Sequence, residues 1–186
     1  MKIAFEGPPA AGKSTLAEYC AATGLASVVP EVNQLFNRPD KEPADWYLER
    51  QVCRWELAQK KQENGSIVIF DGDPFQPLWF GWIYSDEEWT SMEECESFYR
   101  RMIQDGRIGF PDLYIFFMLP EEERRIRESK RGRMKAHDEN RILKKYKRYI
   151  RLVAPQRNYF EALHEKFPNR VCFYESESVE NGARLL

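Results

Sequence analysis

The sequence feature that most constrains the fold is a glycine-rich loop between a short apolar segment and a helical segment. The loop consists of Gly7, Pro8, Pro9, Ala10, Ala11, Gly12, Lys13, Ser14 and Thr15. Its first eight residues match the pattern G-x-x-x-x-G-K-[ST], in which glycines let the backbone turn so that successive N–H groups point at a polyphosphate. Residues 2–6 are typical of a buried strand and residues 13–22 of a helix. This context predicts a cradle for the phosphates of ATP and argues against a chance glycine turn.

Two side chains of the loop are expected to act on the nucleotide. Lys13 is predicted to reach the β- and γ-phosphates as a point charge, and the hydroxyl of Ser14 to ligate Mg²⁺. The helix that begins at Lys13 also presents the positive end of its dipole to the anion. The sequence therefore predicts ATP and Mg²⁺ as cofactors.

Short β-type runs alternate with longer helical patterns along the whole chain. Strands are expected at residues 2–6, 26–31, 66–71, 112–119 and 170–174, and helices at 13–22, 45–64, 91–106, from 121 onward and at 139–166. Ser91 and Glu94 form a capping-box pattern at the start of the third helix. This rhythm predicts a three-layer α/β/α P-loop NTPase fold with a five-stranded parallel sheet, built as one domain over residues 1–186.

Charge and cysteine content exclude several classes of protein. A formal net charge of −2 argues against broad electrostatic binding to nucleic acid or to an anionic membrane. The four cysteines are scattered and give neither a zinc motif nor a disulfide framework. No apolar run is long enough to span a bilayer, and the N-terminal residues do not read as a signal peptide. We expect a cytoplasmic protein with a small-molecule substrate, and the sequence leaves the oligomeric state open, a homodimer included.

Other classes of P-loop protein lack their signatures here. A GTPase needs an Asn-Lys-x-Asp guanine reader, which is absent, and Asp71 is followed by Gly-Asp-Pro at residues 72–74 where a GTPase has Asp-x-x-Gly. A hexameric AAA-type ATPase carries an additional helical domain, for which the chain has little room. A small-molecule kinase remains.

An arginine-rich segment at residues 121–133 supports a kinase. Guanidinium groups neutralise the charge on a transferring phosphoryl group, so we expect a lid at about residues 124–138. Arg131 and Arg133 are the predicted catalytic arginines, whereas residues 122–126 are expected to form a solvated helix face with i,i+4 ion pairs.

The sequence resembles the deoxynucleoside kinase and thymidylate kinase group from about residue 1 to residue 176. The resemblance is carried by Glu6-Gly7, Pro111-Asp112-Leu113-Tyr114-Ile115, Pro120-Glu121, Arg125-Ile126 and Arg131-Gly132-Arg133. It implies ATP-dependent phosphorylation of a nucleoside or a nucleotide, with the adenine of ATP beside residues 176–180.

Two acids are expected to act in catalysis. Glu31 ends the second strand at the carboxyl edge, where a carboxylate can take the proton of an acceptor hydroxyl. In the resembling kinases the acid precedes a proline, whereas here it follows Pro30. Asp71 ends the third strand and is the expected carboxylate for Mg²⁺.

The residues after Asp71 bear on the acceptor. Gly72 stands where the resembling family has an arginine, and Asp73 adds an acid. This change weakens the case for a monophosphate acceptor and favours a neutral or cationic one. Asp73 is predicted to contact the substrate, with capping of the following helix as the alternative.

Substrate walls are expected from two helical segments. Aromatic residues concentrate at residues 75–84, where Phe75 and Trp79 are predicted to contact a flat ring, with burial in the core as the alternative. The resemblance implies that Gln51 reads a base edge, and Arg54 lies three residues on, on the same helix face.

Together these patterns predict an ATP-dependent kinase acting on a hydroxyl acceptor, with a (deoxy)nucleoside as the leading candidate. A nucleoside monophosphate and a non-nucleoside hydroxyl compound, such as an antibiotic, are the alternatives. A non-enzymatic nucleotide-binding regulator is the candidate from another class. The two are distinguished by whether ATP turnover requires an acceptor, as it does for a kinase.

Overall fold

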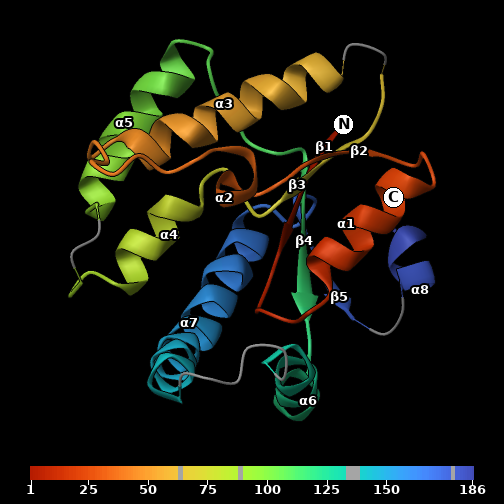
Figure 1. The fold of residues 1–186 in the computed structure, drawn as a ribbon. Coiled ribbons are helices and arrows are strands. Elements are labelled where there is room, and N and C mark those ends of the chain that lie inside the picture. Colours follow the sequence, from red (N-terminus) through yellow and green to blue (C-terminus); the bar gives the residue numbers. More distant parts are fainter. Residues whose placement is uncertain (63–64, 88–89, 133–138, 177–178) are drawn as a thin grey trace.

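The computed structural model describes residues 1–62, 65–87, 90–132, 139–176 and 179–186, and within these residues five strands form one parallel sheet (Figure 1). The strands are β1 (Lys2–Glu6), β2 (Ser27–Val29), β3 (Val68–Asp71), β4 (Leu113–Met118) and β5 (Val171–Glu175). Their order is β2-β3-β1-β4-β5, so β1 lies at the centre. The predicted α/β class with a five-stranded parallel sheet is confirmed.

Helices cover both faces of the sheet. They are α1 (Lys13–Ala22), α2 (Val32–Leu35), α3 (Trp46–Lys61), α4 (Gln76–Ile83), α5 (Met92–Gln104), α6 (Glu121–Gly132), α7 (Glu139–Lys166) and α8 (Val179–Ala183). In Figure 1, α1 and α8 lie on one side of the sheet, and α3, α4, α5 and α7 lie on the other. The molecule therefore has the three predicted layers.

Each face of the sheet has its own hydrophobic core, because successive strand residues point to opposite faces. Ile3 and Phe5 of β1 pack with Leu16 of α1 on one face. Ala4, between them, packs on the other face with residues such as Trp55 of α3. Strands that are buried on both faces are apolar throughout, so they appear in the sequence as continuous hydrophobic runs.

The boundaries of several elements follow local signals. The Ser91 hydroxyl accepts a hydrogen bond from the Glu94 amide at 3.2 Å, and the Glu94 carboxylate accepts one from the Ser91 amide at 3.0 Å. This is the predicted capping box at the start of α5. The short helix α2 was not anticipated, and it directly follows Glu31.

Strand register brings the ends of β1 and β3 to the same edge of the sheet. Phe5 pairs with Asp71, and Glu6 pairs with Phe116 of β4. The connection from β3 to β4 crosses over β1, because β3 and β4 lie on opposite sides of β1. The loop after β1 therefore lies where the strand order reverses direction. Ligands of open α/β sheets bind outside the carboxyl ends of the strands at such a point.

Two further properties concern membrane-spanning helices and the state of the cysteines. Among the described residues, no helix combines the length and the apolar character needed to cross a membrane. All four cysteines are free thiols.

Candidate active site

The loop between β1 and α1 takes a conformation that its glycines permit. Gly7 has φ 131° and Gly12 has φ 93°, both in the region that favours glycine. A Cβ at Gly7 would lie 2.5 Å from the carbonyl oxygen of Phe117, so no larger residue fits there without displacing β4. Ala10 has φ 66°, a conformation that costs a non-glycine residue free energy and is concentrated at functional sites.

The amides at the start of α1 are available to an anion. Pro8 and Pro9 have no backbone N–H, so donors that can face a polyphosphate come from later residues of the loop. Gly12 is the N-cap residue of α1, no side chain caps the helix, and its first turn contains no acidic residue. The first amides of a helix have no partner within the helix, and the dipole makes this end positive. Together they form an anion-binding helix terminus.

Lys13 is positioned by the loop itself. Its Nζ donates to the carbonyl oxygen of Gly7 at 2.6 Å and to that of Pro8 at 3.0 Å. These contacts hold the ammonium group against the backbone of the loop. The geometry suits a polyphosphate whose charge is neutralised by Lys13.

A cavity of about 280 Å³ lies against the loop. It is lined by Glu6, Gly7, Pro9, Ala10, Ala11, Gly12, Lys13, Ser14, Glu31, Gly72, Gln76, Trp79, Phe80, Leu152 and Gln156. The predicted residues Lys13, Ser14, Glu31 and Trp79 thus share one cavity wall with most of the loop. Pro8 and Thr15 lie outside this wall.

Glu6 is a buried carboxylate that sequence reasoning did not assign a role. One of its oxygens accepts a hydrogen bond from the Asp73 amide at 2.6 Å, and the other accepts from the Gly7 amide at 3.2 Å and from Gln156 Nε2 at 2.9 Å. Burial raises the pKa of Glu6 to about 7, although the Lys13 charge and the two amides oppose this. An acid at the end of an otherwise apolar strand was the signal that could have identified it.

Glu31 faces the cavity from the residue that precedes α2. Burial raises its pKa above the usual range, the Asp71 carboxylate raises it further, and Lys13 and Arg54 oppose the shift. A carboxylate with a raised pKa is a better general base than an exposed one near neutral pH. The role of Glu31 as the base stays a prediction.

Asp71 has the property expected of a magnesium ligand. Its Oδ1 is buried and has no hydrogen-bond partner among the described residues. No group of three or more His, Cys, Asp or Glu side chains in the described chain is arranged to hold a metal ion. Mg²⁺ at nucleotide sites commonly takes one or two protein ligands together with substrate phosphates and water. The unpaired oxygen of Asp71 fits one such ligand, and Ser14 lies in the cavity wall, of which Asp71 is not a part.

Four of the predicted substrate residues do not reach the cavity. They are Gln51, Arg54, Asp73 and Phe75, and each is at most 2% exposed. Arg54 Nη1 donates to Gln51 Oε1 at 2.6 Å, which turns both residues toward each other inside the protein. Asp73 Oδ1 accepts a hydrogen bond from the Phe75 amide at 3.0 Å, so its side chain holds the turn before α4. For Phe75 the alternative, burial in the core, matches its 2% exposure, whereas Asp73 bonds the amide of the N-cap residue Phe75 and α4 has no side-chain cap.

The cavity wall combines residues of the predicted aromatic segment with two residues that the sequence did not reveal. Phe80 and Trp79 form an aromatic wall, with ring centroids 4.7 Å apart. Leu152 and Gln156 come from α7, some 150 residues away from Glu6 along the chain. Local patterns contain no signal for such distant partners.

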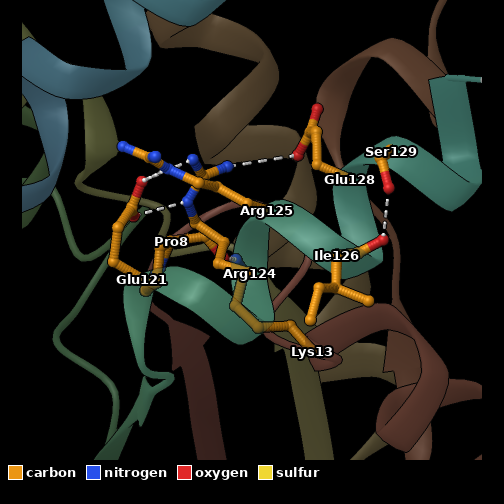
Figure 2. A network of polar contacts seen from close by, with 8 residues as sticks. All are labelled: Pro8, Lys13, Glu121, Arg124, Arg125, Ile126, Glu128 and Ser129. Atoms are coloured by element: carbon orange, nitrogen blue, oxygen red, sulfur yellow. Dashed lines mark hydrogen bonds and ion pairs between the residues drawn. The ribbon is translucent and has the colours of Figure 1, made fainter.

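The helix α6 carries ion pairs that partly differ from the predicted solvated face. Arg124 is only 2% exposed, and it contacts the carboxylates of Glu121 at 2.8 Å and Glu128 at 3.7 Å (Figure 2). The guanidinium group of Arg124 lowers the pKa of Glu121, and Arg125 adds to this effect. Residues 122–126 are therefore not solvated throughout, because Arg124 turns inward.

The predicted lid residues fall near the end of α6. Arg131 lies in the last turn of this helix, whereas Arg133 and the rest of the predicted lid to residue 138 lie outside the described residues. A different arginine reaches the loop: Arg127 Nη2 donates to the carbonyl oxygen of Ser176 at 3.2 Å. The Ser176 hydroxyl in turn donates to the carbonyl oxygen of Ala11 at 2.6 Å. These two hydrogen bonds connect α6 to the segment after β5, and that segment to the loop.

The raised pKa of Glu6 predicts a pH dependence of stability. The unfolded value is about 4.5 and the folded value about 7, so between these pH values the folded protein retains a proton that the unfolded chain has released. The free energy of unfolding should therefore fall as pH rises through this window, by on the order of 3 kcal/mol. Urea unfolding of the nucleotide-free protein at pH 5 and pH 8, beside Glu6→Gln, measures the difference.

Glu165→Gln provides the control for this experiment, because Glu165 is exposed on α7. Its difference from the wild type should not vary between the two pH values. A pH-independent difference for Glu6→Gln as well would contradict a protonated Glu6 in the folded state.

Comparison with known proteins identifies the fold. Neither a protein-family model nor a curated protein matches the sequence. The structure of deoxyadenosine kinase from M. mycoides with bound dATP matches with a TM-score of 0.58 and 20% identity, covering 100% of this chain and 96% of that chain. Thymidylate kinase from Ehrlichia chaffeensis matches with a TM-score of 0.52 and 16% identity, covering 94% and 91%. The chain thus has the fold of nucleoside and nucleotide kinases, as the sequence resemblance implied.

Proposed function

We propose that the protein is an ATP-dependent kinase that transfers the γ-phosphoryl group of Mg·ATP to a hydroxyl group of a small acceptor. The observation that carries this proposal is that one cavity is lined by Lys13, by the uncapped start of α1 and by Glu31. An anion-binding helix terminus and a carboxylate base are the two parts that transfer from a triphosphate to a hydroxyl requires.

Each residue has a defined task in this reaction. The amides at the start of α1 and Lys13 hold the phosphates and stabilise their developing charge. Ser14 and Asp71 would hold Mg²⁺, which neutralises charge on the phosphates when it is bound. Glu31 orients the acceptor hydroxyl and accepts its proton.

A lid is a further part of the proposed site. We assign Arg131 and Arg133 to a lid over the transferring phosphoryl group, at about residues 124–138 of a single kinase domain. Support comes from the position of α6, which follows the carboxyl end of β4 in Figure 1, at the edge of the sheet where the cradle lies.

Two classes of acceptor fit this reaction. The match to a deoxyadenosine kinase favours a (deoxy)nucleoside. The acidic cavity wall, with Glu6 and Glu31 beside Gly72, opposes a monophosphate and favours a neutral or cationic acceptor, which includes non-nucleoside hydroxyl compounds. ATP consumption with and without added nucleosides, monophosphates and amino sugars tests the proposal. ATP turnover that is independent of every acceptor would instead favour a nucleotide-binding regulator.

Replacing Glu31 with glutamine should lower the rate of phosphoryl transfer about 10²-fold or more, because the amide cannot accept the hydroxyl proton. The dissociation constant for Mg·ATP should change less than about threefold, since the phosphates are held by the loop and not by Glu31. Single-turnover kinetics and calorimetry measure the two quantities separately. An unchanged transfer rate would remove Glu31 as the base.

A further inference from the structure

The cavity beside the phosphate cradle has more acidic than basic side chains in its wall. Among the described residues that line the cavity, the charged side chains are Glu6, Lys13 and Glu31. The ammonium group of Lys13 lies against the loop carbonyls, is assigned to the phosphates and lowers the pKa of both acids. Two carboxylates therefore face one described cation of the wall.

The buried guanidinium group of Arg54 lowers the pKa of Glu31 from outside the wall but offers no contact to an acceptor. Arg54 is 1% exposed and lies outside the cavity wall. Its donors are directed at the carbonyl oxygens of Val29, Pro30, Asp71 and Gly72 and at the Gln51 side chain. Its hydrogen-bonding capacity is used within the protein, so it does not offer a site for an anionic acceptor.

The wall is open between the two carboxylates. A Cβ added at Gly72 would meet Glu31 Oε1 and Glu6 Oε1, each at 3.9 Å, and nothing closer. Gly72 has φ 85°, a conformation in which a side chain is strained. The backbone of Gly72 thus lies near an oxygen of each carboxylate. Because glycine has no side chain, it does not fill the space in front of these oxygens.

Gln156 adds an unsatisfied oxygen to the same wall. Its Nε2 donates to a side-chain oxygen of Glu6 at 2.9 Å, so the amide nitrogen is directed at Glu6. The amide oxygen, Oε1, is buried and has no hydrogen-bond partner among the described residues. A buried acceptor of this kind costs free energy unless a ligand or a water donates to it.

Two aromatic side chains, Trp79 and Phe80, complete this part of the cavity wall. Trp79 is 1% exposed, so its ring belongs mainly to the core. The acidic oxygens and the unpaired amide oxygen are the groups of the wall that are complementary to an ammonium group.

We propose that the acceptor is a compact hydroxyl compound carrying a protonated amine, and that Glu6 and Gln156 Oε1 bind its ammonium group while Glu31 faces its hydroxyl. This inference rests on the proposed kinase function. In the reaction the hydroxyl oxygen forms a bond to the γ-phosphorus, and the bond from that phosphorus to the oxygen bridging to the β-phosphate breaks. The products are ADP and the phosphate ester, and Glu31 takes the hydroxyl proton.

Matched pairs of acceptors test the proposal on the wild-type protein. Glucosamine is compared with glucose and N-acetylglucosamine, and kanamycin with its fully N-acetylated form, by ADP release and by thermal shift with Mg·ATP present. We expect at least one amine to exceed its neutral partners about tenfold or more in kcat/KM, because only the amine pairs with the buried oxygens. Deoxyadenosine and dTMP are included as the competing acceptor classes.

The outcomes separate this inference from the kinase function. Equal or better use of the neutral partners, of deoxyadenosine or of dTMP overturns the amine inference and leaves a kinase. Binding of Mg·ATP in calorimetry without any preference for an amine also overturns the inference alone. Absence of Mg·ATP binding overturns the proposed function itself.

Substitution of Gln156 tests the binding residue. Gln156→Leu should raise KM for the preferred amine about tenfold or more and leave KM for ATP within about twofold, a split that general damage to the fold would not give. Glu161→Gln is the control on the same helix, because its side chain is 43% exposed and pairs with Arg157. An unchanged KM for the amine in Gln156→Leu contradicts the assignment.

Discussion

Replacing Lys13 with alanine is expected to lower kcat/KM for phosphoryl transfer at least about 10²-fold, the scale seen when one preorganised charge donor is removed from a transition state. Lys13 is the one described cation in the wall of the cavity, and loop carbonyls at 2.6 and 3.0 Å hold its ammonium group in place. The first-turn amides of α1 remain in the variant, so weak nucleotide binding should persist. A coupled assay of ADP release measures the loss.

Lys60→Ala is the matched control for this experiment. Lys60 lies exposed in the last turn of α3, and its removal should change kcat/KM less than twofold. Near-normal activity of Lys13→Ala would show that the cradle does not hold the transferred phosphate, and the proposed function would then fail.

Replacing Arg54 with alanine is expected to lower the free energy of unfolding by about 3–5 kcal/mol, which for a chain of this size lowers the melting temperature by about 10 °C. Arg54 is 1% exposed. Its guanidinium group donates to the carbonyl oxygens of Val29, Pro30, Asp71 and Gly72 and to Gln51 Oε1, at 2.6 to 3.4 Å. Truncation leaves these buried acceptors without a donor, and such groups are costly to leave unpaired.

Two further variants make this prediction specific. Arg54→Lys should recover only part of the stability, because a lysine cannot reproduce a planar group with five donors. Arg100→Ala removes an arginine whose side chain is 69% exposed, and it should change the free energy of unfolding by less than about 1 kcal/mol. A small effect of Arg54→Ala, measured by chemical denaturation, would contradict the structural role and return Arg54 to the list of candidate substrate contacts.

Arg54 and Gln51 also show why the substrate contacts could not be predicted in full. Their spacing on one helix face is correctly read from the sequence, but the face is directed at the ends of β2 and β3 and not at the cavity. Aromatic content gives the same ambiguity at Phe75 and Trp79. Phe75 packs on Tyr99 with ring centroids 4.8 Å apart, whereas Trp79, four residues on, lines the cavity. Residue type and periodicity are the same for a core contact and a ligand contact.

The sequence by itself determined the elements whose cause is local. The strand–loop–helix unit around Gly7 and Lys13 follows from backbone geometry, and the capping box at Ser91 follows from hydrogen bonds that span three residues. The five strands are predictable from the sequence because burial on both faces requires apolar residues throughout.

Only the tertiary structure decided which side chains meet in the cavity. Gln156 donates to Glu6 across 150 residues of sequence, and Gly72 separates the Glu6 and Glu31 carboxylates through the register of neighbouring strands. Arg124 turns inward from a helix whose sequence predicts a solvated face. Such pairings depend on how layers pack and on which oxygens remain unpaired after folding, and neither quantity is a property of a short stretch of sequence.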